Sequence, residues 1–279
     1  MGLRIQNNVE AFNTHRQLTA TSNAASKSME KLSSGYRINR AADDAAGLGI
    51  SEKMRGQIGG LAQAQRNAQD GISLVQTAEG ALTEVHSMLE RVRDLKVQYN
   101  NGTLDTNDKN AISAEVLEIA KEVKDIFDDT KFNGKTLFTS GDTFKFQVGA
   151  NQGETIDIGA ASFGTVSDLT ALAASVVSDT ATALNAGGTL ASISALDTMI
   201  ENVSKQRGTY GATQNRLEHR LTNLATYQEN LTASESRIRD VDMAAEMTKF
   251  TKLNILQQAG TSMLAQANQA PQGVLSLLR

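Results

Sequence analysis

The side chains that could perform chemistry in this 279-residue chain are few and scattered. Its three histidines, His15, His86 and His219, lie far apart, and none belongs to an HExxH zinc motif. The chain has no cysteine, which excludes disulfides and thiolate metal sites. The glycine-rich segment 47–60 lacks both the GxGxxG spacing and the preceding strand of a phosphate-binding loop. We therefore expect no enzymatic activity, no metal and no cofactor.

The net charge of the chain argues against nucleic acid as a partner. It carries 27 basic and 31 acidic side chains, a net charge of −4, so nothing marks a nucleic-acid footprint. No apolar run is long enough to span a bilayer, and residues 1–15 lack the apolar segment of a secretory signal. These features predict a cytoplasmic protein, unless the chain leaves the cell by a route that uses no such signal.

Composition and spacing both favour long helices that pack side by side. Aromatic residues make up only 4% of the chain, and Pro271 is its one proline. In the C-terminal arm every seventh residue is apolar over seven heptads, a period that keeps facing a partner helix in a supercoil. The alternative is a helix on a globular core, but such helices are usually shorter. The predicted coiled-coil seam consists of Leu196, Val203, Tyr210, Leu217, Leu224, Leu231 and Ile238.

The N-terminal arm contains a similar seam and a second helix. A helix over 58–99 is predicted from the row Leu61, Ala68, Val75, Leu82 and Leu89. A further helix over 112–126 follows a turn, and its expected N-cap is Asn107 or Asp108. Alternating apolar residues over 143–159 predict a β-hairpin.

The expected fold is mainly α. It consists of long antiparallel coiled-coil helices from both chain arms with a small β-hairpin region in the middle, forming an elongated rod. We expect three parts. Residues 1–44 and 240–279 form an inner domain of terminal helices. Residues 45–160 and 193–239 form a helical domain with the hairpin, and 161–192 form a short, variable, surface-exposed segment.

The C-terminal arm presents an apolar face that needs a partner. A helix lying on a membrane surface usually has a Lys/Arg-rich polar face, whereas the polar face here is Gln, Asn, Ser and Thr. Protein partners are therefore favoured over lipid. The residues of this face include Ile255, Leu256, Met263 and Leu264.

Several segments resemble the signature segments of bacterial flagellins. They include "LSSGYRINRAADDAAGLGISEKMRGQI" from Leu32, "FNGKTLF" from Phe132 and "ILQQAGTSMLAQANQAPQGVLSLLR" from Ile255. The resemblance covers roughly 1–160 and 193–279, and it is closest to short flagellins that lack large outer domains. It implies a structural subunit that polymerises into the helical flagellar filament for swimming motility.

The resemblance also implies an export route, a location and partners. The subunit would be exported unfolded through the flagellar type III pathway and would reside in the extracellular filament. Its terminal helices would be disordered in the monomer and line the filament channel. Partners would be other copies of the chain, the flagellar export chaperone, the filament cap, hook-junction proteins and a host Toll-like receptor. The alternatives are a hook–filament junction protein and a secreted coiled-coil translocator.

Two sets of residues correspond to recognition sites of the family. The receptor would recognise Arg91, Leu95 and Glu115, although Leu95 also fits the seam and the two charged residues also fit a solvated face. Lys96 departs from the small or apolar residue common at its position. The chaperone would shield the face formed by Ile255, Leu256, Met263 and Leu264, which also fits burial in the filament.

A charged joint is predicted where the inner domain meets the helical domain. It contains Arg37, Arg40, Asp43 and Asp44. Arg40 and Asp44 are four residues apart and would pair if this segment is helical. The C-terminal arm carries a similar mixture of charges in "SESRIRDVDMAAE", residues 234–246. Our hypothesis is that these two segments meet each other or a neighbouring subunit.

Overall fold

The computed structural model describes residues 8–138, 143–159 and 193–277. The chain divides into two compact units, each built from both arms. The terminal unit comprises Met1–Gln57 and Glu229–Arg279, and the central unit comprises Ile58–Gln228. The expected variable segment 161–192 lies outside the described residues.

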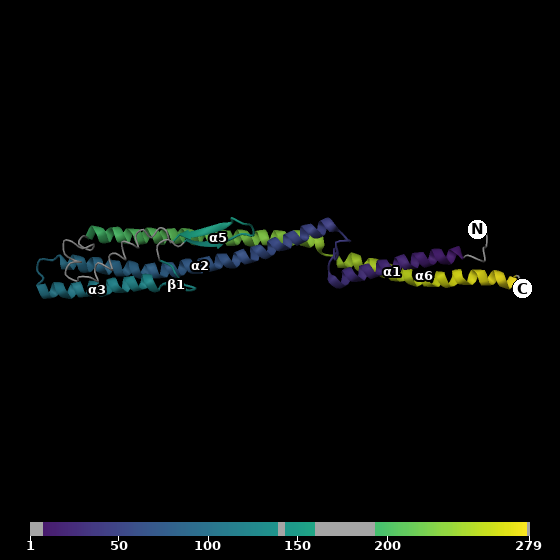
Figure 1. Ribbon diagram of the computed structural model, residues 1–279, viewed down its shortest axis with the longest axis horizontal. Helices are drawn as coiled ribbons and strands as arrows, with labels where there is room; N and C mark the ends of the chain where they lie inside the picture. The colour runs from purple at the N-terminus through teal and green to yellow at the C-terminus, as the bar shows by residue number, and fades with distance from the viewer. Residues whose placement is uncertain (1–7, 139–142, 160–192, 278–279) are drawn as a thin grey trace. The chain divides into compact units, whose positions relative to one another are not determined.

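The terminal unit is built around a pair of helices from opposite ends of the chain. Helix α1 (Val9–Ser34) lies beside helix α6 (Met243–Leu277), as Figure 1 shows. Asn8 is the N-cap of α1, and its side-chain oxygen accepts a hydrogen bond from the backbone N–H of Ala11 at 3.0 Å. The Asn8 amide also donates to the backbone oxygen of Ala267 in α6, at 2.7 Å. The N-terminal end of α1 is thereby attached to the C-terminal half of α6.

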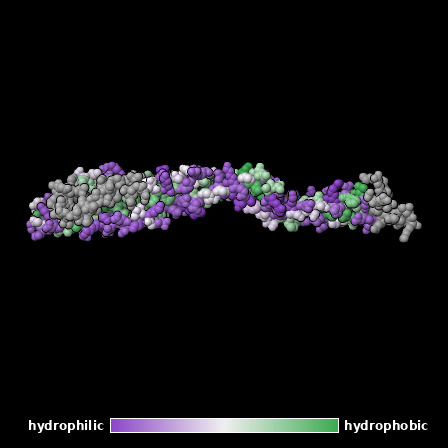
Figure 2. Space-filling view, viewed as in Figure 1, coloured by the Kyte–Doolittle hydropathy of each residue, from purple (hydrophilic) through white to green (hydrophobic). Residues whose placement is uncertain are grey.

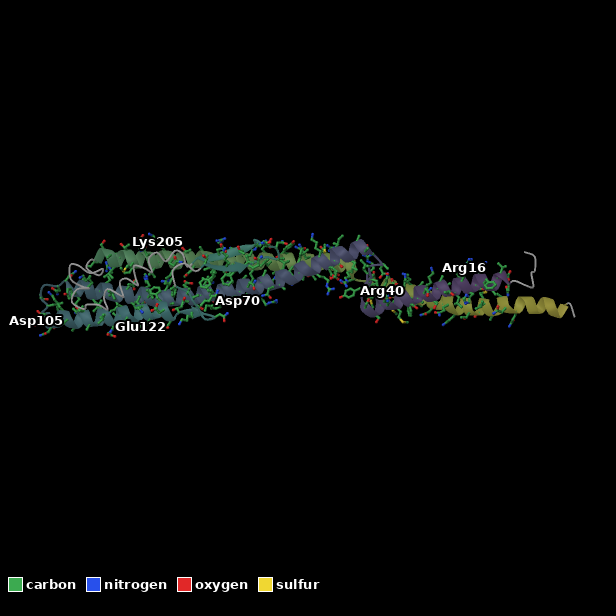
Figure 3. All side chains as sticks on the ribbon, viewed as in Figure 1. Arg16, Arg40, Asp70, Asp105, Glu122 and Lys205 are labelled. Atoms are coloured by element: carbon green, nitrogen blue, oxygen red, sulfur yellow. The ribbon has the colours of Figure 1, made fainter. Side chains whose placement is uncertain are left out.

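The central unit contains three long helical segments. Helix α2 (Ala45–Tyr99) runs antiparallel to α5 (Ile193–Arg239), and α3 (Thr106–Asp129) returns alongside α2. Polar pairs fix the register of α2 against α5. Gln65 donates to Gln228 at 2.8 Å, and Arg93 pairs with Asp197 at 2.6 Å. Charged side chains such as Glu122 of α3 and Lys205 of α5 point away from the bundle (Figure 3).

One hydrophobic core joins the three helices of the central unit. The apolar row of α2 predicted from the sequence is buried along its whole length. The contribution of α5 is also buried: Leu196 and Leu217 are both 0% exposed. The large, fully buried side chains of this core include Leu82, Leu89, Leu95, Leu137, Phe138, Leu196 and Leu217.

Helix α3 begins earlier than the sequence suggested. Its N-cap is Asp105, not Asn107 or Asp108, and the Asp105 side chain accepts from the backbone N–H of Thr106 at 2.6 Å. Asp108 occupies the third helical position and completes a reciprocal capping box with Asp105. The expected capping residue is therefore part of the cap, but on its helical side.

Two short hairpins cover the helices of the central unit. Strands β1 (Lys131–Phe132) and β2 (Lys135–Thr136) form the first, and β3 (Thr143–Gln147) pairs antiparallel with β4 (Thr155–Gly159) in the second. The second hairpin is anchored on both long helices. Asn67 of α2 donates to the Gln147 oxygen at 2.9 Å, and Arg220 of α5 donates to the Val148 oxygen at 3.1 Å.

The fold expected from the sequence is confirmed as mainly α, with antiparallel helices from both arms and a small hairpin region between them. Helix α2 is longer than the predicted 58–99 because it begins at Ala45. The proposed domain boundaries stay a prediction. They coincide with the first residue of α2 and the last residue of α5, whereas the two compact units divide at 57/58 and 228/229. Among the described residues, no helix combines the length and apolar character needed to cross a membrane.

Candidate functional site

Small side chains fill the contact between α1 and α6. The buried residues of α1 are Thr21, Ala25 and Ser28, and none is large. On α6, a Cβ atom placed on Gly260 would lie only 3.1 Å from the Leu18 side chain of α1. The two backbones therefore approach closely, but the contact buries little apolar surface. A pair of this kind gains less from the hydrophobic effect than the bundle of the central unit does.

Large apolar side chains of the same two helices are exposed instead. Phe12 of α1 is 72% exposed and Ile255 of α6 is 61% exposed. Figure 2 shows hydrophobic patches interrupting the polar surface of the terminal unit. Of the predicted assembly face, Ile255, Leu256 and Met263 are exposed, whereas Leu264 is half-buried. The exposed apolar residues of the pair are Val9, Phe12, Met29, Met243, Met247, Ile255, Leu256 and Met263.

The two segments that connect the terminal helices to α2 and α5 pair with each other through their backbones. Tyr36 and Asp240 form an isolated antiparallel bridge. The backbone N–H of Arg37 donates to the Arg239 oxygen at 2.7 Å, and that of Val241 donates to the Gly35 oxygen at 3.0 Å. We call these two segments, 35–44 and 239–242, the crossing segments.

Arg239 connects the crossing segments to the first turns of α2. Its guanidinium pairs with Glu52 at 2.5 Å and lies over the ring of Tyr36, 4.8 Å from the ring centre. The hydrogen bond from Arg239 lowers the pKa of the Glu52 carboxyl below its usual range. The Arg239 side chain is only 12% exposed, so packing and charge both hold it in place.

The residues of the predicted joint are brought together, but not with the expected partners. Arg37 donates to the backbone oxygen of Ile238, at 2.5 Å, on the opposite segment. Arg40 pairs with Glu30 of α1 at 2.8 Å rather than with Asp44. The segment is not helical here, and Asp44 accepts from the backbone N–H of Gly47 at 2.8 Å in the first turn of α2. The Arg40–Asp44 pair, expected only for a helical segment, is therefore not formed.

Two glycines permit the path of the first crossing segment. Gly35 ends α1 in the left-handed region with φ of 77°, and its N–H donates to the Lys31 oxygen. Gly47 lies against the buried side chain of Ile38. A Cβ atom at Gly47 would lie 2.8 Å from Ile38 Cδ1 and 2.5 Å from Asp44 Oδ2. Substitution of Gly47 would displace the group that caps α2.

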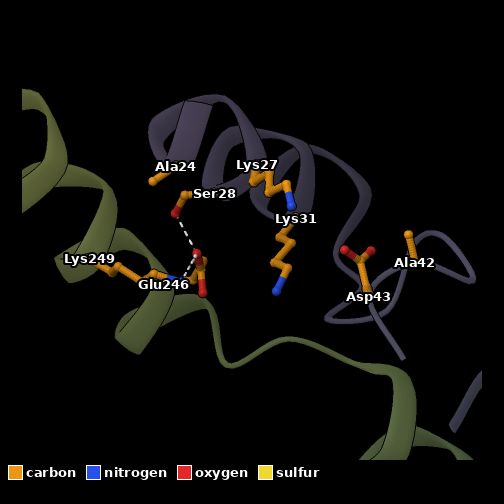
Figure 4. A pocket seen from close by; sticks show the side chains of 8 residues that line it. All are labelled: Ala24, Lys27, Ser28, Lys31, Ala42, Asp43, Glu246 and Lys249. Atoms are coloured by element: carbon orange, nitrogen blue, oxygen red, sulfur yellow. Dashed lines mark hydrogen bonds and ion pairs between the residues drawn. The ribbon is translucent and has the colours of Figure 1, made fainter. Parts of the chain in front are cut away.

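A charged pocket lies between α1, α6 and the first crossing segment (Figure 4). Inside it the Ser28 hydroxyl, 1% exposed, donates to the Glu246 carboxylate of α6. Lys249 pairs with the same carboxylate at 3.3 Å. The bond from Ser28, followed by the interaction with Lys249, lowers the pKa of Glu246 below its usual range. This pair and the Asn8–Ala267 hydrogen bond are polar contacts between the two terminal helices.

The predicted receptor residues lie on neighbouring helices of the central unit. Arg91 of α2 donates to one carboxylate oxygen of Glu115 in α3, from Nη2 at 2.6 Å and from Nε at 3.0 Å. Both side chains are exposed, whereas Leu95 is 2% exposed and belongs to the core. Lys96 is also 2% exposed, and burial lowers the pKa of its amine. The Arg91–Glu115 pair is therefore accessible from solvent, whereas Leu95 is not.

The predicted seam of α5 is buried from near the N-terminal end of the helix to Leu224 and is less buried beyond it. Five members, Leu196, Val203, Tyr210, Leu217 and Leu224, are buried, and Leu231 and Ile238 are half-buried. Burial raises the pKa of the Tyr210 hydroxyl to about 12. Ser28, Tyr36 and Arg239 were not among the residues that sequence reasoning singled out. The signal for Arg239 was the charged run 234–246, but Ser28 lies in a helix with no distinguishing pattern.

No set of three or more histidine, aspartate or glutamate side chains within the described ranges is arranged to hold a metal ion. The terminal unit has three features that could contact other molecules. They are the exposed apolar side chains of α1 and α6, the crossing segments paired through their backbones, and the charged pocket. Such a set is suited to binding other chains.

Known protein families and relatives match nearly the whole chain. The model of the bacterial flagellin N-terminal helical region matches residues 5–143, and that of the C-terminal helical region matches 193–278. A flagellin of Halalkalibacterium halodurans is 53% identical over 276 residues, 99% of each chain. One of Bacillus subtilis is 51% identical over 306 residues, covering 99% of this chain and 100% of the relative.

A solved structure shares the fold at much lower identity. It is that of a putative flagellar hook-associated protein from Vibrio parahaemolyticus, with a TM-score of 0.55 and 17% identity. The match covers 71% of this chain and 100% of that one. This likeness concerns the fold alone.

Proposed function

We infer that this chain, which belongs to the bacterial flagellin family, is the structural subunit that polymerises into the extracellular flagellar filament used for swimming. It is not an enzyme. The structural observation that carries the inference is the exposed apolar set of α1 and α6. Isolated chains leave these side chains in water, so copies gain free energy by burying them against one another.

Assembly into a helical polymer requires each copy to use two different surfaces. A head-to-tail contact between unlike surfaces does not close on itself and therefore generates a helical polymer. Both α1 and α6 carry exposed apolar side chains, so each helix of one copy has surface available to a neighbour. We propose that the terminal helices line the channel and complete their packing only in the filament.

Export of an unfolded chain is compatible with the weak packing of the terminal unit. Only small residues of α1 are buried against α6, so the pair has little apolar burial to lose when it opens. We propose that the chain passes through the type III pathway unfolded and that the terminal pair forms last. The functional boundary of the inner domain is proposed at 44/45 and 239/240, where α2 begins and α5 ends.

The further partners are proposals of the same kind. The exposed residues Ile255, Leu256 and Met263 would be covered by the export chaperone before assembly. The exposed Arg91–Glu115 pair would be read by a host Toll-like receptor. The filament cap and hook-junction proteins would contact the same terminal helices as neighbouring copies do.

A hook–filament junction protein is the nearest alternative. The shared fold with a hook-associated protein explains why the two classes resemble each other, but the identity is only 17%. Identities of 53% and 51% over the full chain favour the filament subunit. Nothing favours a secreted translocator.

Electron microscopy of the purified protein, seeded with filament fragments, tests the function. We expect long hollow helical tubes that grow with time. A chain from which α6 is removed after Thr248 is the matched control and should not polymerise. Persistent monomers or short capped assemblies of the intact chain would contradict the function.

A further inference from the structure

The charged pocket of the terminal unit contains more positive than negative side chains. Its volume is about 280 Å³, and it opens between α1, α6 and the first crossing segment (Figure 4). Three ammonium groups face two carboxylates, which leaves an excess of one positive charge. The lining residues are Ala24, Lys27, Ser28, Lys31, Ala42, Asp43, Glu246 and Lys249.

Both carboxylates of the pocket are already engaged within the chain. Asp43 Oδ2 accepts from the backbone N–H groups of Arg40 at 3.1 Å and Asn39 at 3.3 Å. Glu246 accepts from the Ser28 hydroxyl and pairs with Lys249 at 3.3 Å. Lys249 is therefore already paired with Glu246, whereas Asp43 bonds to uncharged backbone groups and keeps its negative charge in the pocket.

Lys27 and Lys31 are the cations that remain. Within the described part of the chain, neither forms an ion pair, although both lie near enough to Asp43 to favour its charged form. They are four residues apart on α1, so their like charges face each other across one helical turn. Such a pair destabilises a helix slightly unless an anion lies between the two ammonium groups. In Figure 4 the Lys31 side chain extends between Glu246 and Asp43.

We propose that Lys27 and Lys31 bind a carboxylate of a second copy of this chain. The proposal rests on the proposed function, because it needs copies that assemble. Each copy carries a net charge of −4, so copies repel one another and each brings an excess of carboxylates to its neighbours. A local cationic site on an acidic chain is complementary to such carboxylates, and charge complementarity fixes register and orientation.

The geometry also explains why the site is a specific one. Arg40, which pairs with Glu30, holds the crossing segment beside the pocket, and Glu246 holds α6 there. Lys27 and Lys31 lie on one face of α1, and docking of α6 and the crossing segment encloses them in the pocket. The site is complete in the folded terminal unit and absent from an unfolded chain.

Zero-length cross-linking in filaments tests the proposal. A carbodiimide activates a carboxylate, which an adjacent lysine amine attacks to form an amide, with net loss of water. Filaments grown from a mixture of heavy-nitrogen and normal copies should give amide links from Lys27 or Lys31 to an Asp or Glu of the other isotope. The same treatment of monomers should give none.

Charge-neutral variants supply a second measurement. K27Q together with K31Q should raise the critical concentration for assembly by about threefold to tenfold, in line with the loss of two partly exposed ion pairs. Its matched control is K121Q with K124Q, which removes the same charge from α3, where both lysines pair within the chain. The control should stay close to the unmodified chain, and circular dichroism should show equal helix content in all three.

The outcomes separate this proposal from the proposed function. If the unmodified chain forms no filaments, the function itself fails. If filaments form but Lys27 and Lys31 link only to Asp43 or Glu246 of their own copy, the site is internal and the proposal is overturned. Inorganic phosphate that shifts the Lys27 and Lys31 resonances of monomers, without any intermolecular link in filaments, would identify a free oxyanion as the occupant and would also overturn it.

Discussion

Ser28 of α1 donates a hydrogen bond to the carboxylate of Glu246 in α6, joining two side chains 218 positions apart in the chain. The other buried residues of α1 in this contact are small, so apart from the Asn8–Ala267 bond and the approach of Leu18 to Gly260 little distinguishes one sliding position of the helices from another. A polar pair inside an apolar contact is a device that fixes register. We therefore regard Ser28 and Glu246 as the residues that position the terminal helices.

Loss of the Ser28 hydroxyl should loosen the α1–α6 pair. In S28A the Glu246 carboxylate loses a partly buried donor, and we expect a loss of about 1–2 kcal/mol in the free energy of opening α6. Hydrogen exchange of the α6 backbone amides measures this free energy of opening. The control is S26A, because Ser26 is exposed and bonds only to the backbone of its own helix. Equal protection of α6 in the two variants would contradict the role of Ser28.

Acid should weaken the same contact. The Ser28 bond holds the folded-state pKa of Glu246 below the ordinary value of 4.5, so its contribution is present above that value and is lost as the pH falls through the folded pKa. The lysines that face Glu246 are Lys31 and Lys249. We expect E246Q to open more readily than the unmodified chain near neutral pH and equally readily below the folded pKa. A difference that persists unchanged in acid would argue against this assignment.

Removal of a seam side chain should show where the central unit is stabilised. L217A deletes a side chain that is 0% exposed and should cost about 2–5 kcal/mol of unfolding free energy, whereas L231A lies at a half-buried seam position and should cost less. Thermal unfolding followed by circular dichroism measures both. Equal losses would show that the seam is packed evenly along α5.

Replacement of Arg91 should lower receptor signalling while changing the stability of the fold little. R91A breaks an exposed ion pair, so it should change the unfolding free energy by less than about 1 kcal/mol while lowering potency in a receptor reporter assay. R93A is the matched control, because Arg93 pairs with Asp197 instead. L95A is a poor probe, since Leu95 is a core residue and its loss would disturb the fold. Unchanged potency of R91A would remove the receptor proposal.

The crossing segments should be sensitive to the shape of residue 239 as well as to its charge. R239K keeps a cation for Glu52 but loses the planar group that lies over Tyr36, so we expect filaments that are fewer or altered in shape. R237K is the control, because Arg237 is exposed and contacts only Ser234 of its own helix. Electron microscopy compares the two. Normal filaments from R239K would show that the charge alone suffices.

The parts of the fold that the sequence revealed are those in which burial repeats along a helix or strand. The heptad row of α5 was visible because large apolar side chains recur at Leu196, Val203 and Leu217. The first turns of α2 were missed because glycine and alanine dominate there and give no such period. Asp105 was missed as a cap because Asn107 and Asp108 are equally good capping residues.

The crossing was anticipated as a meeting of charges, and the two segments do meet, but largely by other means. Arg37 and Arg239 are joined through a backbone N–H and a backbone oxygen, groups that every residue carries and no side-chain pattern encodes. The Ser28–Glu246 bond escaped prediction for a related reason. Two ordinary residues become partners only once α1 and α6 have been placed side by side.

The small residues between α1 and α6 bear on how accurately a long polymer can be built. Thr21, Ala25 and Ser28 have few rotamers to lose, so docking them costs little conformational entropy. Few rotamers also mean few alternative packings, and each added copy therefore ends in the same geometry. In a tube that repeats one contact along its whole length, a slight angular error at each step would accumulate into visible curvature. A contact made of small side chains keeps that error small.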